Sequence, residues 1–433
     1  MSQQRPTIVF FPEGAYGPTN NCVGIANVLR AMGARVVFVV EESFAGTLEA
    51  KGFEEALMRL KPKPLIEETP GQFWKDFIRD TAPQFRKPTI EQLETLIRPI
   101  WMELIDGAKY VQARLREIFA DLQPDVIVQD NVVAFPAVHT AGVPWVRIMS
   151  CNPLEMKDPD LPPTFSGYPS SDRAHWDEFR TRYRELHAGL HTDFDSFCRS
   201  AGAPALPEGE FIHESPYLNL YVYPAEADYE RSRPLAPNWH RLDSCVRATD
   251  APFQVPDRLR AGSGRLVYLS LGSLGSADVP LMTRLIDLLA ETEHGVIVSM
   301  GPQHEQLALA DNMVGAEFLP QTSILPQVDV AVTHGGNNTV TESFHFGKPM
   351  VALPLFWDQY DNAQRIADLG FGARLDPYSF EDQDLEAALA RLLADDGLRA
   401  NMGGIADRLQ QSPGTAKAAS LIGRLGRERG PVV

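Results

Sequence analysis

The stretch VDVAVTHGGNNTVTESFHFGKPMVALPL, residues 328–355, decides the fold class of this chain. It opens with an apolar run, VDVAV, that predicts a buried strand, and it closes with another, PMVALPL. A glycine-rich turn and the start of a short helix lie between the two runs. A strand, a helix and a second strand in this order are typical of the βαβ unit, whose two strands run parallel. The sequence therefore predicts an α/β fold with a parallel sheet.

The same alternation extends outward from this stretch in two series. The first series predicts a helix at 21–33, which Gly33 ends, and strands at 7–11, 34–40, 125–130 and 143–149. The second series predicts helices at 280–292 and 382–395, and strands at 265–272, 295–301, 316–320, 328–336 and 349–355.

A proline-bearing and weakly periodic segment separates the two series, which is typical of a domain boundary. A chain of 433 residues is also too long for one ordinary core, so we expect two domains. We expect an N-terminal domain at 1–233, a linker at 234–252 and a C-terminal domain at 253–411. Two facing parallel-sheet domains place a ligand cleft between the carboxyl ends of their strands.

The overall composition excludes several classes of partner. A formal charge of −17 argues against nucleic acid or an anionic membrane as the main partner, although one phosphate can still bind at a local site. The four cysteines are far apart and form no CxxC pair, so neither zinc nor a disulfide framework is expected. The first residues lack the apolar core of a signal peptide, and no run is long enough for a membrane span. We expect a soluble, cytoplasmic protein.

The turn inside the opening stretch has the chemistry of a nucleotide diphosphate site. Gly336 and its neighbour let a ligand approach the backbone, and Asn338 and Thr339 fall at the start of a helix, where free N–H groups favour anions. His334 can donate a hydrogen bond and, if protonated, supply a positive charge. Glu342, one turn later, suits adjacent ribose hydroxyls better than a phosphate. The alternative is an ordinary helix with Asn338 as its cap and Glu342 in solvent.

Residues 318–366 resemble a known family. The segment FLPQTSILPQVDVAVTHGGNNTVTESFHFGKPMVALPLFWDQYDNAQRI is similar to the nucleotide-sugar signature of the family 1 glycosyltransferases, which use UDP-sugars and have the GT-B fold. The order and length of the domains agree across nearly the whole chain, and the likeness is to the bacterial macrolide and natural-product type. The resemblance implies two facing Rossmann-like domains with the ligand cleft between them. It also implies that a C-terminal helix within 412–433 packs back on the N-terminal domain.

The resemblance implies a role for each residue of the signature. Phe318 would stack on the uracil, the backbone of Leu319 would bind the uracil edge, and Gln321 belongs to the same turn. Glu342 would bind the ribose. The diphosphate would lie against Ser273, His334, Gly336, Asn338 and Thr339. The sugar hydroxyls would bind Asp358 and Gln359, a pair associated with glucose in this family; the alternative for both is a surface turn.

The first loop departs from the family pattern. Many members carry a His-Gly pair after the first strand, and that histidine deprotonates the acceptor; Tyr16-Gly17 stands there in this chain. Asp130 matches the aspartate that orients the histidine. Three interpretations remain open: Asp130 takes the proton directly or through a water, Tyr16 only shapes the site, or the protein binds a sugar nucleotide without efficient turnover. Glu13 is a weaker candidate for the base, and Tyr16 alone is a poor base because its unperturbed pKa is about 10.

The leading hypothesis is an enzyme that transfers a hexose, with inversion, from a UDP-sugar to a hydroxyl of a small, largely apolar acceptor such as a phenolic or polyketide compound. The UDP-sugar is a co-substrate, and neither a cofactor nor a metal is expected, since no DxD-like pair ends a strand. One alternative is a UDP-sugar epimerase of the same architecture, against which the aromatic residues at 60–120 argue mildly. Those large side chains are Phe73, Trp74, Phe77, Trp101 and Met102. The other alternative is a non-catalytic sugar-nucleotide-binding protein.

Overall fold

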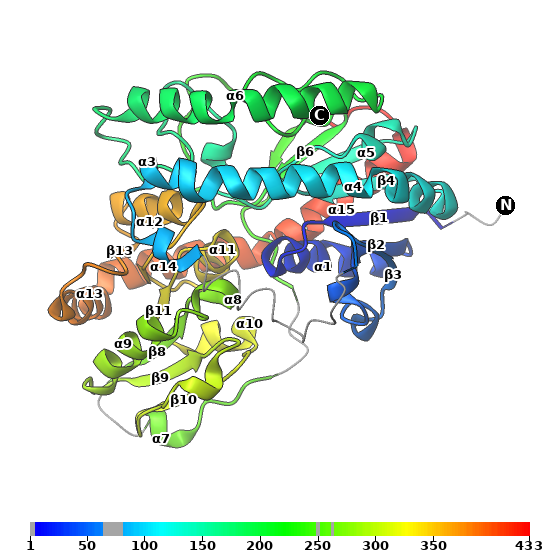
Figure 1. Cartoon of the computed structure of the whole chain (residues 1–433). Coiled ribbons are helices and arrows are strands. Elements are labelled where there is room, and N and C mark those ends of the chain that lie inside the picture. The colour runs from blue at the N-terminus through cyan, green and yellow to red at the C-terminus, as the bar shows by residue number, and fades with distance from the viewer. Residues whose placement is uncertain (1–4, 64–80, 248–251, 261–263) are drawn as a thin grey trace.

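The structure is a computed structural model that describes residues 5–63, 81–247, 252–260 and 264–433. It contains a seven-stranded and a six-stranded sheet, and every strand pair within them is parallel. Figure 1 shows the elements of the first sheet above those of the second. The predicted fold class, two facing Rossmann-like parallel-sheet halves, is confirmed.

The first sheet has the strand order β3-β2-β1-β4-β5-β6-β7. Its strands are β1 (Thr7–Pro12), β2 (Arg35–Glu41), β3 (Glu54–Met58), β4 (Val126–Asp130), β5 (Trp145–Met149), β6 (Leu218–Tyr221) and β7 (Trp239–Arg241). The central strands are continuous apolar runs because helices cover both faces of the sheet. Pro12 pairs with Asp130 in register, so the residues after β1 and β4 meet at the carboxyl edge of the sheet.

The second sheet has the strand order β10-β9-β8-β11-β12-β13. Its strands are β8 (Leu266–Ser270), β9 (Gly295–Ser299), β10 (Met313–Ala316), β11 (Val330–Thr333), β12 (Met350–Ala352) and β13 (Gly372–Arg374). Thr333 pairs with Ser270, which brings the glycine loop after β8 beside the turn after β11.

Helices connect the strands and cover both sheets. They are α1 (Tyr16–Ala31), α3 (Thr89–Gln92), α4 (Arg98–Leu122), α5 (Pro136–Thr140), α6 (Trp176–Ser200), α7 (Asp257–Arg260), α8 (Gly272–Gly275), α9 (Val279–Ala290), α10 (Gln321–Ile324), α11 (Asn337–His345), α12 (Gln359–Asp368), α13 (Asp382–Ala394), α14 (Asp396–Gln411) and α15 (Gly414–Glu428). A π-helical segment, η3 (Leu93–Ile97), joins α3 to α4. Short 3-10 turns are η1 (Glu42–Phe44), η2 (Glu49–Lys51), η4 (Pro153–Glu155), η5 (His304–Gln306) and η6 (Leu325–Gln327).

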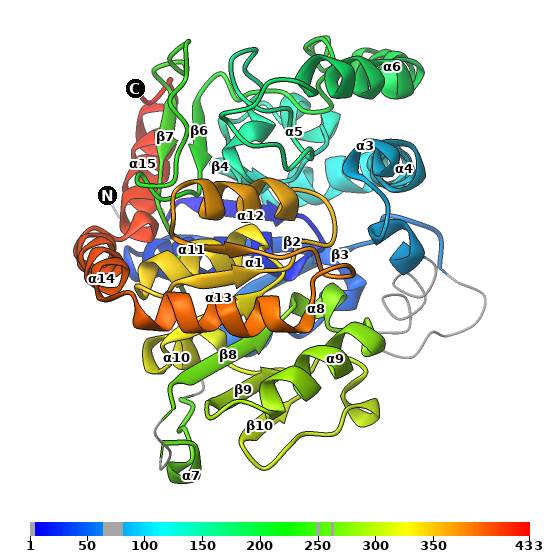
Figure 2. The same ribbon diagram turned by 90° about the vertical axis from the view of Figure 1, so that its left-hand side faces the viewer.

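The last helix, α15, belongs to the core of the first sheet although it follows the second half of the chain. Ala418, Ile422 and Leu425 pack in one cluster with Ile8 and Phe10 of β1. Gly24 of α1 allows this packing, because a Cβ there would lie 3.0 Å from the Thr415 methyl group. In Figure 2 the red helix α15 runs beside the strands of the first half.

Three elements differ from the sequence-based expectation. The strand expected at 316–320 lies at Met313–Ala316, because its ladder with β9 runs only from Met313 to Ala316. Residues 239–241, expected in the linker, add β7 to the first sheet, and Trp239 packs on Tyr221. The first helix begins at Tyr16, so the residue expected in a loop is helical.

The aromatic residues at 60–120 are only partly described. Trp101 is buried and Met102 is exposed, while Phe73, Trp74 and Phe77 lie outside the described residues. Among the helices of the described ranges, none has the length and apolar character needed to cross a membrane.

Candidate active site

Two glycines make room for the His334 ring at the carboxyl edge of the second sheet. A Cβ at Gly272 would lie 2.7 Å from Cε1 of His334, and one at Gly336 would lie 2.4 Å from its Nε2. Both distances are shorter than real contacts, so only glycine permits this ring position. Ser273, beside Gly272 in α8, is half-buried at the same place. The structure thus brings together the loop after β8, His334 and the start of α11.

This packing predicts the effect of Gly336→Ala. The backbone of Gly336 has φ −60° and ψ 138°, which alanine adopts freely, so the added methyl group acts only by displacing the ring of His334. We expect UDP to bind about 10- to 100-fold more weakly, the range of one hydrogen bond to a charged group. Calorimetry measures the affinity, and Gly403→Ala, where an added Cβ meets nothing within 4 Å, is the matched control. Equal affinity in the two variants would contradict the assignment.

His334 is neutral at pH 7 in this structure. Burial lowers the pKa of its ring to about 4, and a hydrogen bond with the backbone of Ser270 opposes this only in part. The positive charge that protonation would supply is therefore absent, and His334 can offer a single N–H. The remaining attraction for an anion comes from the start of α11. Its N-cap residue, Gly336, makes no side-chain hydrogen bond to the first N–H groups of the helix. The alternative of Asn338 as cap is wrong, because the helix begins at Asn337 and its N-cap is Gly336.

Glu342 lies at the centre of a buried hydrogen-bond network and is only 2% exposed. Its Oε1 accepts from Arg247 at 2.8 Å and from Asn338 Nδ2 at 3.0 Å, and its Oε2 accepts from Gln321 Nε2 at 2.7 Å. Gln321 also donates to Thr339 Oγ1 at 3.3 Å. Four residues predicted for the nucleotide thus meet in one network, and the alternative of a solvated Glu342 is wrong.

Arg247 is part of this network but was not predicted from the sequence, and its charge has a clear electrostatic role beside Glu342. A carboxylate beside a diphosphate is unfavourable, and the Arg247 guanidinium compensates the charge of Glu342. Arg247 lies in the expected linker, far from the motif in sequence, and no local pattern identifies it. Asn337 was also missed: its side chain donates to the Val222 carbonyl after β6, which joins the two halves beside the site.

Phe318 and Tyr16 face each other across the two halves. The Phe318 ring is 55% exposed, as a surface for stacking must be, and it lies 6.3 Å from the Tyr16 ring. Tyr16 also contacts Phe44, at 5.6 Å, and its neighbour Gly17 lies close to Asn338. Leu319 is partly buried next to Phe318. Tyr16 is therefore on the nucleotide side of the site.

Asp358 and Gln359 are buried at the start of α12 rather than displayed on a surface turn. Oδ2 of Asp358 accepts from the Asn152 N–H at 2.8 Å, and burial raises the pKa of Asp358 to about 7. Oε1 of Gln359 accepts from the Leu355 N–H at 3.0 Å. Trp357, just before them, has a positive φ of 59°, which is rare for a large side chain and fixes the direction of the turn.

Asp130 and Glu13 lie side by side at the edge of the first sheet. The Glu13 N–H donates to the Asp130 carbonyl at 2.8 Å, as their neighbouring strands require. Oδ2 of Asp130 accepts from Ser150 Oγ at 2.6 Å, and Ser150 in turn accepts from Asn21 at 3.0 Å. Asp130 is 3% exposed, and this burial raises its pKa to about 7 although the Ser150 hydrogen bond opposes the shift.

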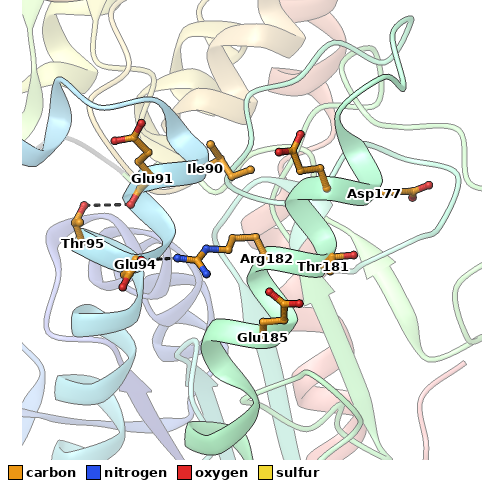
Figure 3. A pocket seen from close by; sticks show the side chains of 9 residues that line it. Ile90, Glu91, Glu94, Thr95, Asp177, Thr181, Arg182 and Glu185 are labelled. Atoms are coloured by element: carbon orange, nitrogen blue, oxygen red, sulfur yellow. Dashed lines mark hydrogen bonds and ion pairs between the residues drawn. The ribbon is translucent and has the colours of Figure 1, made fainter.

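A wide hollow of about 670 Å³ lies elsewhere, between η3 and α6 (Figure 3). Its lining carries five carboxylates, and its one cation, Arg182, is paired with Glu94. This negative surface repels a diphosphate, so the hollow is not the nucleotide site. In the described part of the chain, no group of three or more His, Cys, Asp or Glu side chains is arranged to hold a metal ion.

Part of the chain is similar to known sugar transferases. Residues 216–409 match the family model described as "UDP-glucoronosyl and UDP-glucosyl transferase". Zeaxanthin glucosyltransferase of Pantoea ananas is 26% identical over 71% of this chain and 73% of its own length. Oleandomycin glycosyltransferase of Streptomyces antibioticus is 24% identical over 96% of this chain and 90% of its own length.

Solved structures share the fold over the whole chain. The kitacinnamycin glycotransferase has a TM-score of 0.71 at 21% identity, covering 97% of this chain and 99% of that one. The calicheamicin glycosyltransferase CalG4 has a TM-score of 0.69 at 19% identity, and the match covers 98% of this chain and 100% of that one. Taken together with the signature at 318–366, these matches show that residues 216–409 are similar to the UDP-glucuronosyl and UDP-glucosyl transferases, and that the whole chain shares the GT-B fold of the solved glycosyltransferases.

Proposed function

We propose that this enzyme transfers a hexose, with glucose as the first candidate, from a UDP-sugar to a hydroxyl of a small, largely apolar natural product such as a phenol or polyketide. The observation that carries the proposal is the network of Glu342, Gln321, Asn338 and Thr339 beside His334 at the start of α11. The names of relatives support the acceptor class, since they include zeaxanthin glucosyltransferase, demethyllactenocin mycarosyltransferase and oleandomycin glycosyltransferase.

In this proposal the nucleotide spans the network. The uracil stacks on Phe318 with its edge at the Leu319 backbone, and Tyr16 closes the other side of the base. The ribose hydroxyls bind Glu342, which keeps acceptor capacity because a carboxylate has about four lone-pair sites. The diphosphate lies against Ser273, His334, Gly336, Asn338 and Thr339. The sugar hydroxyls bind Asp358 and Gln359.

The chemistry needs positioning, a base and stabilisation of the leaving diphosphate. The neutral His334 donates one hydrogen bond, and the start of α11 presents its N–H groups to the charge that develops on the departing UDP. We propose that the proton of the acceptor passes to a carboxylate at the edge of the first sheet, where Asp130 and Glu13 lie side by side and the usual histidine is absent.

The test is incubation with UDP-glucose, UDP-galactose or dTDP-glucose and a panel of phenols, followed by mass spectrometry. We expect an acceptor that gains one hexose, with UDP-glucose preferred, because a site built for two ribose hydroxyls discriminates against a deoxyribose. A changed sugar nucleotide without acceptor would identify an epimerase instead. Binding of UDP without either product would identify a non-catalytic protein.

A further inference from the structure

The side chain of Glu13 has an unusual position for a carboxylate. It follows β1 directly and is half-buried, with its backbone fixed by the hydrogen bond to Asp130. Within the ranges that the structure describes, no hydrogen bond or ion pair engages its carboxylate oxygens. A partly desolvated carboxylate that is left without a partner is costly, which points to a task other than structural stabilisation.

An apolar cavity adjoins Glu13 on the side of the first sheet. Most of its walls are apolar and include Phe11, Met58, Leu60, Leu104, Val133 and Phe135, while Asn131 adds one polar side chain. Glu13 is the single ionisable side chain in the lining, and Asp130 is not part of it. The cavity is narrow, about 20 Å³, which is room for about one water molecule in this structure. An apolar acceptor would enter here by moving flexible side chains such as Met58 and present its hydroxyl to Glu13.

The nucleotide-sugar site adjoins Glu13 on the other side. Asp358, at the start of α12, is close enough for its charge to act on the Glu13 carboxylate. Four residues after Glu13, Gly17 lies against Asn338, because a Cβ there would be 3.7 Å from the Asn338 Cβ. Glu13 is thus placed between an apolar cavity and the residues proposed for the sugar and the diphosphate, which is where a base must be in a transfer reaction.

We propose that Glu13 is the catalytic base, that the apolar cavity beside it receives the acceptor, and that Asp130 is a positioning residue. The inference rests on the proposed function. One carboxylate oxygen of Glu13 takes the proton of the acceptor hydroxyl while the oxygen of that hydroxyl bonds to the anomeric carbon. The bond from this carbon to the diphosphate oxygen breaks, and its electron pair leaves with UDP. Glu13 then returns the proton to solvent.

The charges that face Glu13 suit this role. Burial and then the carboxylates of Asp130, Glu155 and Asp358, in that order, together raise the pKa of Glu13 to about 7. Arg147 is paired with Glu155 at 2.8 Å, which moderates the negative field. A base with a pKa near the working pH is more effective than an ordinary carboxylate, so it can also deprotonate phenols that carry no activating group.

The experiment compares Glu13→Gln with wild type, using UDP-glucose and two acceptors, phenol and the more acidic 4-nitrophenol. We expect kcat for phenol to fall by about 10²–10⁴-fold, the usual contribution of a general base. With 4-nitrophenol above its own pKa, where no base is needed, the loss should be less than about 10-fold. The wild-type rate should rise with pH through about 7, and this rising limb of the pH–rate profile should be absent in Glu13→Gln. Affinity for UDP should not change.

Two further variants keep the result interpretable. Asp130→Asn should move the limb to lower pH, because it removes a negative charge that raises the pKa of Glu13. Glu49→Gln, an exposed carboxylate on η2 that does not line the cavity, should behave as wild type. If Glu13→Gln does not fold, Glu13→Asp should keep the pH limb at a lower rate. A Glu13→Gln enzyme that keeps the wild-type rate and limb with phenol would overturn the inference. A wild-type enzyme that binds UDP but glycosylates no phenol would instead refute the proposed function, and the inference with it.

Discussion

Arg247→Met is expected to lower the free energy of unfolding by about 3 kcal/mol, because it leaves a buried carboxylate without its cation. Glu342 is 2% exposed, and Arg247 is its one ion-pair partner in the described part of the chain, at 2.8 Å. Removing one member of such a pair costs about 3–5 kcal/mol. We expect the lower end of this range, since Gln321 and Asn338 continue to donate to the carboxylate and the Arg247 side chain is itself 18% exposed.

Equilibrium unfolding in urea measures this effect, and two controls separate its causes. Arg114→Met breaks the exposed pair with Glu117 and should cost less than about 1 kcal/mol. Glu342→Gln removes the charge but keeps the shape, so it should cost less than Arg247→Met and restore most of the stability in the double variant. Equal losses for Arg247→Met and Arg114→Met would show that the buried pair does not stabilise the fold. Glu342→Gln should still weaken UDP binding, which distinguishes its proposed ribose role from the structural role of Arg247.

The alternation of strands and helices could be predicted because it depends on local periodicity. The runs that became β1, β4, β8 and β11 are mostly apolar, with polar residues only at their ends, and each is followed by a turn. Edge strands are harder to predict because pairing with a neighbour defines them. The short β7 has no strong apolar pattern, and it exists because residues 239–241 pair with β6.

The site could be predicted as far as the motif extends, and no further. The signature located His334, Asn338 and Glu342, which the structure brings together around α11. It could not locate Arg247 or the cavity beside Glu13 on which the proposed base depends. Both depend on burial and on partners far away in sequence, such as the 95 residues between Arg247 and Glu342. The neutral state of His334 likewise follows from desolvation, which a sequence does not display.

Asp361→Ala is expected to lower the free energy of unfolding by about 2–6 kcal/mol and to loosen the contact between the two halves. Asp361 lies on α12 and is 2% exposed. Its carboxyl oxygens accept from the N–H groups of Phe165 at 2.6 Å and Gly167 at 2.8 Å, which belong to the first half. Alanine leaves both groups buried without acceptors, at about 1–3 kcal/mol each. Figure 2 shows α12 facing the elements of the first half, so this helix joins the halves.

Unfolding in urea and small-angle scattering measure the two consequences. The radius of gyration should increase in Asp361→Ala, because the hydrogen bonds that hold the loop at 165–167 against α12 are lost. Asp368→Ala is the matched control: Asp368 is on the same helix and accepts from the Ser170 N–H at 3.3 Å, but it is exposed. It should change stability by less than about 0.5 kcal/mol. Identical unfolding curves for the two variants would contradict the role of Asp361.

The pH dependence gives a second readout of the same interaction. Burial raises the pKa of Asp361 from 3.8 to about 8, although the hydrogen bonds from Gly167 and Phe165 oppose the shift. Between these values the folded chain keeps a proton that the unfolded chain has lost. The contribution of Asp361 to stability therefore falls as pH rises and levels off above about 8. The difference in stability between wild type and Asp361→Ala should narrow by about 1 kcal/mol from pH 7 to 8, whereas Asp368→Ala should follow wild type throughout.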